Sequence, residues 1–148
     1  MAQFDSNDDS VVVIIGSGAG GGTLANELCQ KGVKVVVLEA GGGWLGHWFD
    51  RFDHFAHVYA WMAPGLSLKP SEYFARQVHG CYWFEEYAPR HMLDTLPVDN
   101  ILFETDFPHP TCLYPSAREH ALDVLSGWSD EIQRKVLQDN AAKLYRIA

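Results

Sequence analysis

The chain has 148 residues, of which 47% are hydrophobic and 20% charged, a balance typical of a globular domain. A formal net charge of −8 without a basic stripe argues against nucleic acid and anionic membranes as partners. No apolar run is long enough to span a membrane, and the acidic start MAQFDSNDDS lacks the pattern of a secretory signal. We therefore expect a cytoplasmic protein, in which the three widely spaced cysteines are free thiols.

The first regular elements predict a β-α-β unit. The β-branched run Val11–Ile15 predicts a strand buried on both faces, and Thr23–Lys31 predicts a helix that turns Leu24 and Leu28 inward. A second buried strand is expected over Val33–Leu38. This order implies parallel strands joined by a right-handed crossover.

The composition changes after this unit and becomes rich in aromatic residues. Strands and helices still alternate, which predicts a parallel α/β architecture. If the first two strands join those of the later part, the result is an open, doubly wound sheet of about five strands. The expected elements, in chain order, are an aromatic helix over 44–62, a short helix over Ser71–Arg76 capped by Ser71, a strand over Val78–Phe84, a helix over Glu85–Leu96 interrupted at Pro89, a strand over Asn100–Glu104 and a helix over 129–146 capped by Ser129.

The turn after the first strand carries a nucleotide-binding pattern. Its residues Gly16-Ser17-Gly18-Ala19-Gly20-Gly21 match G-x-G-x-x-G, in which the glycines allow a tight turn, the approach of a pyrophosphate and close helix packing. The helix N-terminus then offers free N–H groups to the phosphates. Glu39, at the end of the second strand, would bind ribose hydroxyls and repel a 2′-phosphate, which favours FAD or NAD over NADP. The alternative is a glycine-rich helix start with no ligand.

The stretch VVVIIGSGAGGGTLANELCQKGVKVVVLEAGG closely resembles the N-terminus of glucose–methanol–choline (GMC) oxidoreductases. The resemblance covers about residues 11–42, which we take as a dinucleotide-binding βαβ unit after a disordered leader of residues 1–10. It implies FAD as cofactor. The residues that it places around the ADP moiety are Gly16, Ser17, Gly18, Gly20, Gly21 and Glu39. The catalytic His of that family has no counterpart in this sequence.

The remainder resembles a different family. The segments GGGWLGHWFDRFDHF, LKPSEYFARQVHGCYWFEE, VDNILFETDFPHP and SDEIQRKVLQDNAAKLYRIA are similar to the C-terminal part of amidohydrolase-related (β/α)-barrel proteins, the kin of aminocarboxymuconate-semialdehyde decarboxylase. This resemblance implies that residues 43–148 form the last strand–helix units of a (β/α)8 barrel, hence an incomplete barrel. It also implies metal-dependent hydrolysis or decarboxylation of a small acid.

The amidohydrolase resemblance also implies catalytic roles. Asp106, just beyond a predicted strand, would bind or adjoin a divalent metal such as zinc and shuttle a proton. His109 would line the site, and Arg51 would hold a substrate carboxylate. The other interpretations are a turn cap for Asp106, turn structure for His109 and an ordinary helix salt bridge for Arg51. No His-x-His metal pair occurs in the sequence, and His54 with His57 would supply too few ligands, so we expect that this chain does not bind the metal.

These two resemblances together indicate a hybrid, or chimera, of a Rossmann-like βαβ unit and part of a barrel. Neither catalytic set is complete. Three functions therefore stay open: an amidohydrolase-type enzyme, an FAD-dependent oxidoreductase fragment, and a non-catalytic nucleotide-binding or interaction protein. The expected partners are a small molecule or nucleotide and a second copy of the chain that would cover exposed sheet edges.

Overall fold

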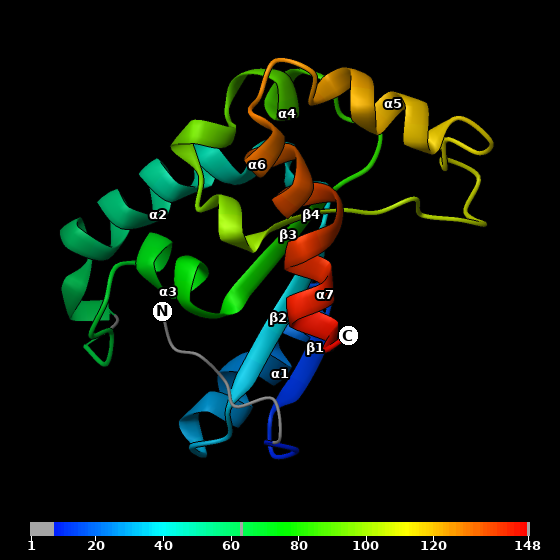
Figure 1. Cartoon of the computed structure of the whole chain (residues 1–148). Helices are drawn as coiled ribbons and strands as arrows, with labels where there is room; N and C mark the ends of the chain where they lie inside the picture. The colour runs from blue at the N-terminus through cyan, green and yellow to red at the C-terminus, as the bar shows by residue number, and fades with distance from the viewer. Residues whose placement is uncertain (1–7, 63, 148) are drawn as a thin grey trace. The chain divides into compact units, whose positions relative to one another are not determined.

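The computed structural model describes residues 8–62 and 64–147, and it confirms a parallel α/β fold (Figure 1). These residues form two compact units. The first contains the described residues up to Leu38 together with Trp44–His79, and the second contains Glu39–Gly43 with the described residues from Gly80 onward. Within the described ranges the sheet has four strands in the order β1-β2-β3-β4, one fewer than the approximately five expected. It is open, not closed into a barrel.

The βαβ unit of the sequence prediction is present in the first unit. It consists of β1 (Val12–Ile15), α1 (Ala19–Gln30) and β2 (Val35–Ala40). The two strands are parallel, with Val12 opposite Val35 and Ile15 opposite Leu38. Alternate residues of each strand pack against one face of α1, and this layer contains Ile14, Val35 and Val37 with Val12, Ala25, Leu28, Val33 and Val78 around them.

The two strands of this unit differ in burial. Val35–Leu38 of β2 are buried on both faces, as predicted. In β1 only Ile14 is buried, whereas Val13 is 50% exposed and Ile15 80% exposed, so the prediction of burial on both faces is wrong for this strand. The cause is position, because an edge strand has a neighbour on one side only. Leu24, predicted to face inward from α1, is also exposed.

The predicted aromatic helix is α2 (Leu45–Val58), which lies between the short 3₁₀ turns η1 (Gly42–Trp44) and η2 (Ala60–Met62). It packs against α3 (Pro70–Gln77) through a T-shaped contact between Phe49 and Phe74. Ser71 does not cap α3. Its backbone N–H and hydroxyl donate to the Asp53 carboxylate of α2, at 2.9 and 2.6 Å, while the helix begins after Lys69. Ser71 therefore joins two helices rather than starting one.

The last three residues of β3 (Val78–Tyr82) belong to the second unit, where they pair in parallel with β4 (Ile101–Phe103), with Gly80 opposite Ile101 and Tyr82 opposite Phe103. The expected helix over Glu85–Leu96 is present only as two short pieces, and the predicted interruption at Pro89 is wrong. Pro89 lies in the first turn of the first piece, where no N–H is needed, and the break falls at Met92. One helix of this unit was not predicted. The helices between β3 and the C-terminal helix are α4 (Tyr87–His91), η3 (Leu93–Thr95), η4 (Val98–Asn100) and the unpredicted α5 (Ala117–Val124).

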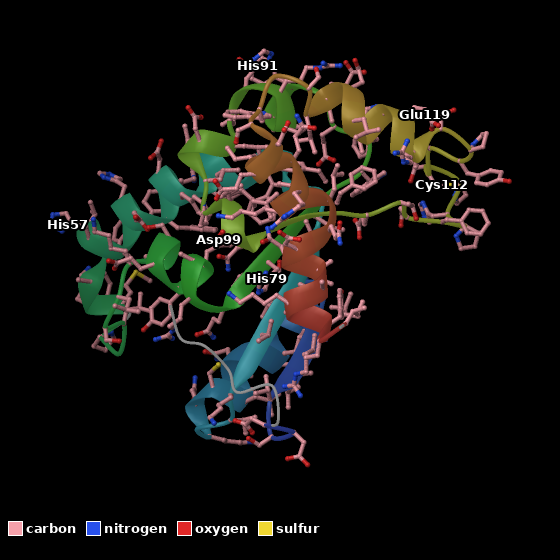
Figure 2. The ribbon with its side chains drawn as sticks, in the orientation of Figure 1. His57, His79, His91, Asp99, Cys112 and Glu119 are labelled. Carbon is pink, nitrogen blue, oxygen red and sulfur yellow. The ribbon has the colours of Figure 1, made fainter. Side chains whose placement is uncertain are left out.

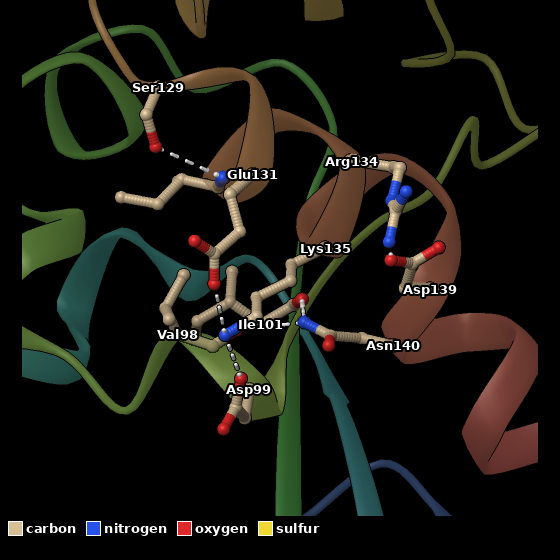
Figure 3. Close-up of polar contacts among 10 residues, drawn as sticks. Val98, Asp99, Ile101, Ser129, Glu131, Arg134, Lys135, Asp139 and Asn140 are labelled. Atoms are coloured by element: carbon tan, nitrogen blue, oxygen red, sulfur yellow. Dashed lines mark hydrogen bonds and ion pairs between the residues drawn. The ribbon is translucent and has the colours of Figure 1, made fainter.

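The predicted C-terminal helix consists of α6 (Asp130–Arg134), a π-helical turn η5 (Lys135–Asp139) and α7 (Asn140–Tyr145). Figure 3 shows its polar contacts, including the predicted cap, in which the Ser129 hydroxyl accepts the Ile132 N–H. The buried Asn140 side-chain amide donates to the carbonyls of Val98 (2.8 Å) and Ile101 (2.7 Å). It thereby fixes the helix to the start of β4.

No helix among the described residues is both long and apolar enough to cross a membrane. Residues 1–7 of the predicted leader lie outside the described ranges. Asp8 lies within them and forms an ion pair with Lys34.

The Asn140 contacts generate a stability prediction. Asn140→Ala should lower the free energy of unfolding by about 2 kcal/mol, because two backbone carbonyls lose the donor that satisfies them. The urea midpoint should fall at an unchanged slope. Asn26→Ala is the control, since Asn26 is exposed on α1 and accepts only from Gln30. Equal shifts for the two variants would contradict the assigned role of Asn140.

Candidate functional site

The loop that follows β4 holds the candidate catalytic carboxylate. Asp106 has a left-handed backbone (φ 54°), a conformation that Asp tolerates better than most residues, and its carbonyl accepts the His109 N–H at 2.8 Å. Its carboxylate accepts the Thr111 hydroxyl at 3.2 Å and lies 3.2 Å from the His109 Nδ1. His109 Nδ1 is in turn 2.7 Å from the Thr111 hydroxyl. The loop therefore brings two of the predicted site residues, Asp106 and His109, into direct contact.

The Asp106 side chain contacts residues of its own turn, Thr111 and His109, rather than the next backbone N–H. The backbone N–H of Phe107 faces the Thr105 hydroxyl at 3.4 Å and not the Asp106 carboxylate. About a third of the Asp106 side chain is exposed. This carboxylate is thus held in place by Thr111 and His109 and remains open to solvent.

A partly buried acidic group, Glu104, lies beside this loop. The Glu104 backbone N–H donates to the Tyr82 carbonyl at 2.9 Å, which continues the β3–β4 ladder to the end of the strand. Burial raises the pKa of the Glu104 carboxyl, and the neighbouring charges of Asp106, Glu85 and Glu39 raise it further. The end of β4 therefore carries two carboxyl groups in unlike surroundings.

Cys81 of β3 is the buried neighbour of Glu104. Burial raises the pKa of its thiol to about 12, and the charges of Glu104 and Glu39 act in the same direction. Glu85 belongs to the same acidic group, but its carboxylate is occupied by the N–H groups of Gly43 and Trp83, at 3.2 and 3.0 Å. In the second unit, then, the carboxylate of Glu39 acts electrostatically on Cys81 and Glu104.

The glycine-rich turn is placed in the first unit between β1 and α1. Gly16 has φ +88°, and its N–H donates to the Leu38 carbonyl at 2.7 Å. A Cβ on Gly21 would lie 1.8 Å from the Gly16 carbonyl oxygen, so this position admits glycine alone. A Cβ on Gly18 or Gly20 would meet nothing within 4 Å. The first and last glycines of the motif are therefore required by the fold, whereas packing explains neither Gly18 nor Gly20.

The turn also leads into an uncapped helix. Gly18 is the N-cap of α1, no side chain caps the helix, and its first turn contains no acidic residue. The N–H groups of such a helix end attract anions. Together with the open space at Gly18 and Gly20, this arrangement fits the phosphates of a nucleotide.

Arg51, the third predicted catalytic residue, lies on α2 in the first unit. Its guanidinium lies over the ring of Phe55 at 4.8 Å and near that of Trp48 at 5.9 Å. His54 and His57 of the same helix are exposed, and Figure 2 shows His57 near the end of α2. Although exposed, the His54 ring lies 6.0 Å from that of Phe55.

The described parts of the chain offer too few potential metal ligands in one place. There, no group of three or more His, Cys, Asp or Glu side chains has the arrangement to hold a metal ion. Asp106 offers one exposed carboxylate, and a metal centre needs three or four ligands. The described residues thus do not form a complete metal site.

Comparison with known protein families identifies the class of this chain. Residues 25–147 match the family model described as Amidohydrolase. Because this match covers most of the sequence, the chain belongs to the amidohydrolase family. The open parallel sheet accordingly corresponds to part of a (β/α) barrel.

Solved structures show the same fold. A 5-carboxyvanillate decarboxylase from Novosphingobium aromaticivorans, with bound manganese, is 16% identical and has a TM-score of 0.65, covering 86% of this chain and 39% of its own. An amidohydrolase from Mycobacterium avium subsp. paratuberculosis is 24% identical, with a TM-score of 0.61 and coverage of 74% and 27%. A manganese-containing dihydroxybenzoic acid decarboxylase from Polaromonas sp. JS666 is 20% identical, with a TM-score of 0.59 and coverage of 76% and 34%. The chain thus spans less than half the length of these structures.

One curated protein matches a short part of the chain. A long-chain-alcohol oxidase from Arabidopsis thaliana is 47% identical over 45 residues, which is 27% of this chain and 6% of that protein. The chain therefore spans a small fraction of this relative.

Sequence reasoning missed several residues of the second unit. From the sequence, Cys81 had no expected role beyond that of a free thiol, and Glu104 was placed at the end of a predicted strand. The signal in the sequence for a pair of acidic residues was the spacing Glu104-Thr105-Asp106 at a strand end. The alternation of side chains along a strand would, however, have placed both carboxylates on the same face of the sheet. The left-handed Asp106 redirects the chain, and Thr111 takes part only because of that turn.

The raised pKa of Cys81 makes its reactivity predictable. Below about pH 12 the folded protein should keep this thiol protonated and unreactive toward iodoacetamide, whereas the exposed Cys29 should be alkylated. Mass spectrometry of the alkylated peptides, with and without urea, distinguishes the two. In the folded protein the pKa of the Cys81 thiol exceeds its ordinary value of 9.0. The buried thiol therefore contributes to stability below pH 9.0, and this contribution is lost as the pH rises from 9.0 to about 12. Alkylation of both thiols at equal rates in the native protein would refute the burial of Cys81.

Proposed function

We propose that this chain supplies the Asp106 side of an amidohydrolase-type site that hydrolyses or decarboxylates a small acid. The observation that supports this best is the placement of Asp106 just beyond β4, held by Thr111 and His109 with its carboxylate open to solvent. In (β/α) barrels the reacting residues lie at this end of the strands. The solved structures of similar fold include manganese-containing decarboxylases.

The roles follow from the contacts of each residue. Asp106 accepts or returns a proton at its carboxylate, and His109 with Thr111 orients that carboxylate. Arg51 lies in the first unit with its guanidinium over the Phe55 ring, so its proposed role in holding a substrate carboxylate rests on the family resemblance alone. A divalent metal, manganese or zinc, would polarise the substrate if it were bound, but the described residues hold no group of three or more His, Cys, Asp or Glu side chains arranged for it. We propose, accordingly, that the chain by itself is not catalytically competent.

A second candidate function is binding of a nucleotide, such as the ADP half of FAD, at the glycine turn. The specific observation is the empty space that a Cβ would enter at Gly18 and Gly20, next to the uncapped start of α1. The short match to an alcohol oxidase gives it further support. Gly16, Ser17, Gly18, Gly20 and Gly21 would then surround the phosphates, and Glu39 would bind the ribose. In this view the chain is a hybrid of a GMC-type βαβ unit and an amidohydrolase barrel segment.

The first proposal predicts how the chain binds metal. Titration of the purified chain with Mn²⁺, and separately with Zn²⁺, should show weak binding, because one carboxylate is a poor site. Asp106→Asn should abolish this binding, and calorimetry measures the change. Asp94→Asn is the control, since Asp94 is exposed on η3 away from this loop.

Two results of this titration would count against the first proposal. Tight, stoichiometric zinc binding would show that the chain holds a complete metal site after all. Binding that survives Asp106→Asn but not Asp94→Asn would remove Asp106 from the assigned role.

The second proposal predicts different effects at two glycines. Gly21→Ala should destabilise the fold by roughly 1–3 kcal/mol, because its Cβ would overlap the Gly16 carbonyl. Gly18→Ala should lower stability by less than about 1 kcal/mol, since a Cβ has room there but alanine is a poorer N-cap than glycine, yet it should weaken ADP binding at least tenfold. Thermal unfolding and calorimetry with ADP and FAD give the two quantities. Equal ADP affinity of the wild type and Gly18→Ala would rule out this site.

A further inference from the structure

The outer edge of β1 is unpaired within the described residues. The N–H groups of Val12 and Gly16 donate to β2, at the carbonyls of Lys34 (2.9 Å) and Leu38 (2.7 Å). Because backbone groups alternate in direction along a strand, those of Val13 and Ile15 point to the opposite side. In the strand order β1-β2-β3-β4 no described strand occupies that side. The edge therefore presents free donors and acceptors.

The side chains along this edge are apolar and exposed. Val13 is 50% exposed and Ile15 80% exposed, on the face opposite to the buried Ile14. Natural edge strands are usually protected by lysine, proline, a bulge or an inward-pointing charge. The run Val11–Ile15 has none of these. It is thus a surface suited to pairing with another strand.

The charge distribution favours a second copy of this chain as that partner. The chain carries a net charge of −8, yet no charged residue occurs between Ser10 and Asn26. Two copies can therefore meet along β1 without placing carboxylates against each other. The N-terminal end of α1, which has no acidic residue in its first turn, lies at one end of this edge, and the exposed Asp9 lies at the other.

We propose that two copies of the chain associate by antiparallel pairing of their β1 strands. A two-fold axis through Val13 sets the register: Val13 pairs with Val13 of the second copy, and Val11 pairs with its Ile15. Both are hydrogen-bonded pairs, because all these residues direct their backbone groups outward. The same register brings Asp9 toward the positive N-terminal end of α1 in the other copy.

This geometry also fixes the expected strength of the association. Five residues per strand bury a small area compared with a stable protein interface. The dimer is therefore weak and depends on concentration. It does not rest on the proposed catalytic site, but it places Asp9 of one copy near the proposed phosphate site of the other.

Sedimentation velocity across a concentration series tests the proposal. The wild-type chain should shift from monomer to dimer as its concentration rises. Val13→Lys should raise the dissociation constant at least tenfold, because two like charges then face each other across the axis. Val13→Glu should do the same, and an equimolar mixture of the two variants should dimerise again. Leu24→Lys is the matched control, since Leu24 is 49% exposed but lies on α1 and not on the edge.

A second measurement uses the wild-type chain alone and is independent of variant folding. The amides of Val13 and Ile15 should exchange hydrogen more slowly at high than at low protein concentration. A wild-type chain that stays monomeric, or a dimer that Val13→Lys leaves intact, overturns the proposal. So does failure of the mixed variants to associate, or exchange at Val13 and Ile15 that is independent of concentration.

Discussion

Parallel strand pairing is the constraint on which the structure depends. Parallel strands end at the same side of a sheet, and their crossovers carry helices on its faces. In the second unit this pairing sets Cys81 of β3 beside Leu102 of β4, so that the thiol and Glu104 at the strand end come together. In the first unit it sets Ile15 beside Leu38, directly before the glycine turn. Each candidate site follows from a strand pair rather than from a loop alone.

The two glycine roles separate folding from binding within one motif. Gly16 and Gly21 are required by backbone geometry, since one has positive φ and the other lies against a carbonyl. Gly18 and Gly20 have open space around the position of a side chain. The phosphate binding proposed for this turn rests on the open space at Gly18 and Gly20. Family membership, which rests on residues 25–147, neither requires nor excludes phosphate binding.

The acidic groups near β4 show how burial differentiates residues of the same type. Glu104 is partly buried among other carboxylates, which favours its neutral form, whereas Asp106 is exposed and held by Thr111 and His109. Glu85 is used structurally, because two backbone N–H groups occupy its carboxylate. Carboxylates that lie close together therefore do not by themselves form a functional site. Their hydrogen bonds determine which of them can still bind a ligand.

The sequence by itself determined the local elements whose signals are local: the βαβ unit, the glycine turn, the Ser129 cap and the strand that leads to Asp106. Tertiary structure decided what depends on neighbours. β1 has the same apolar pattern as β2, yet it lies at the edge and is exposed, because burial is set by strand order and not by the strand's own residues. Ser71 follows the pattern of a helix cap, but it binds Asp53, a residue 18 positions away. Such contacts join distant parts of the chain, and only the packed fold brings them together.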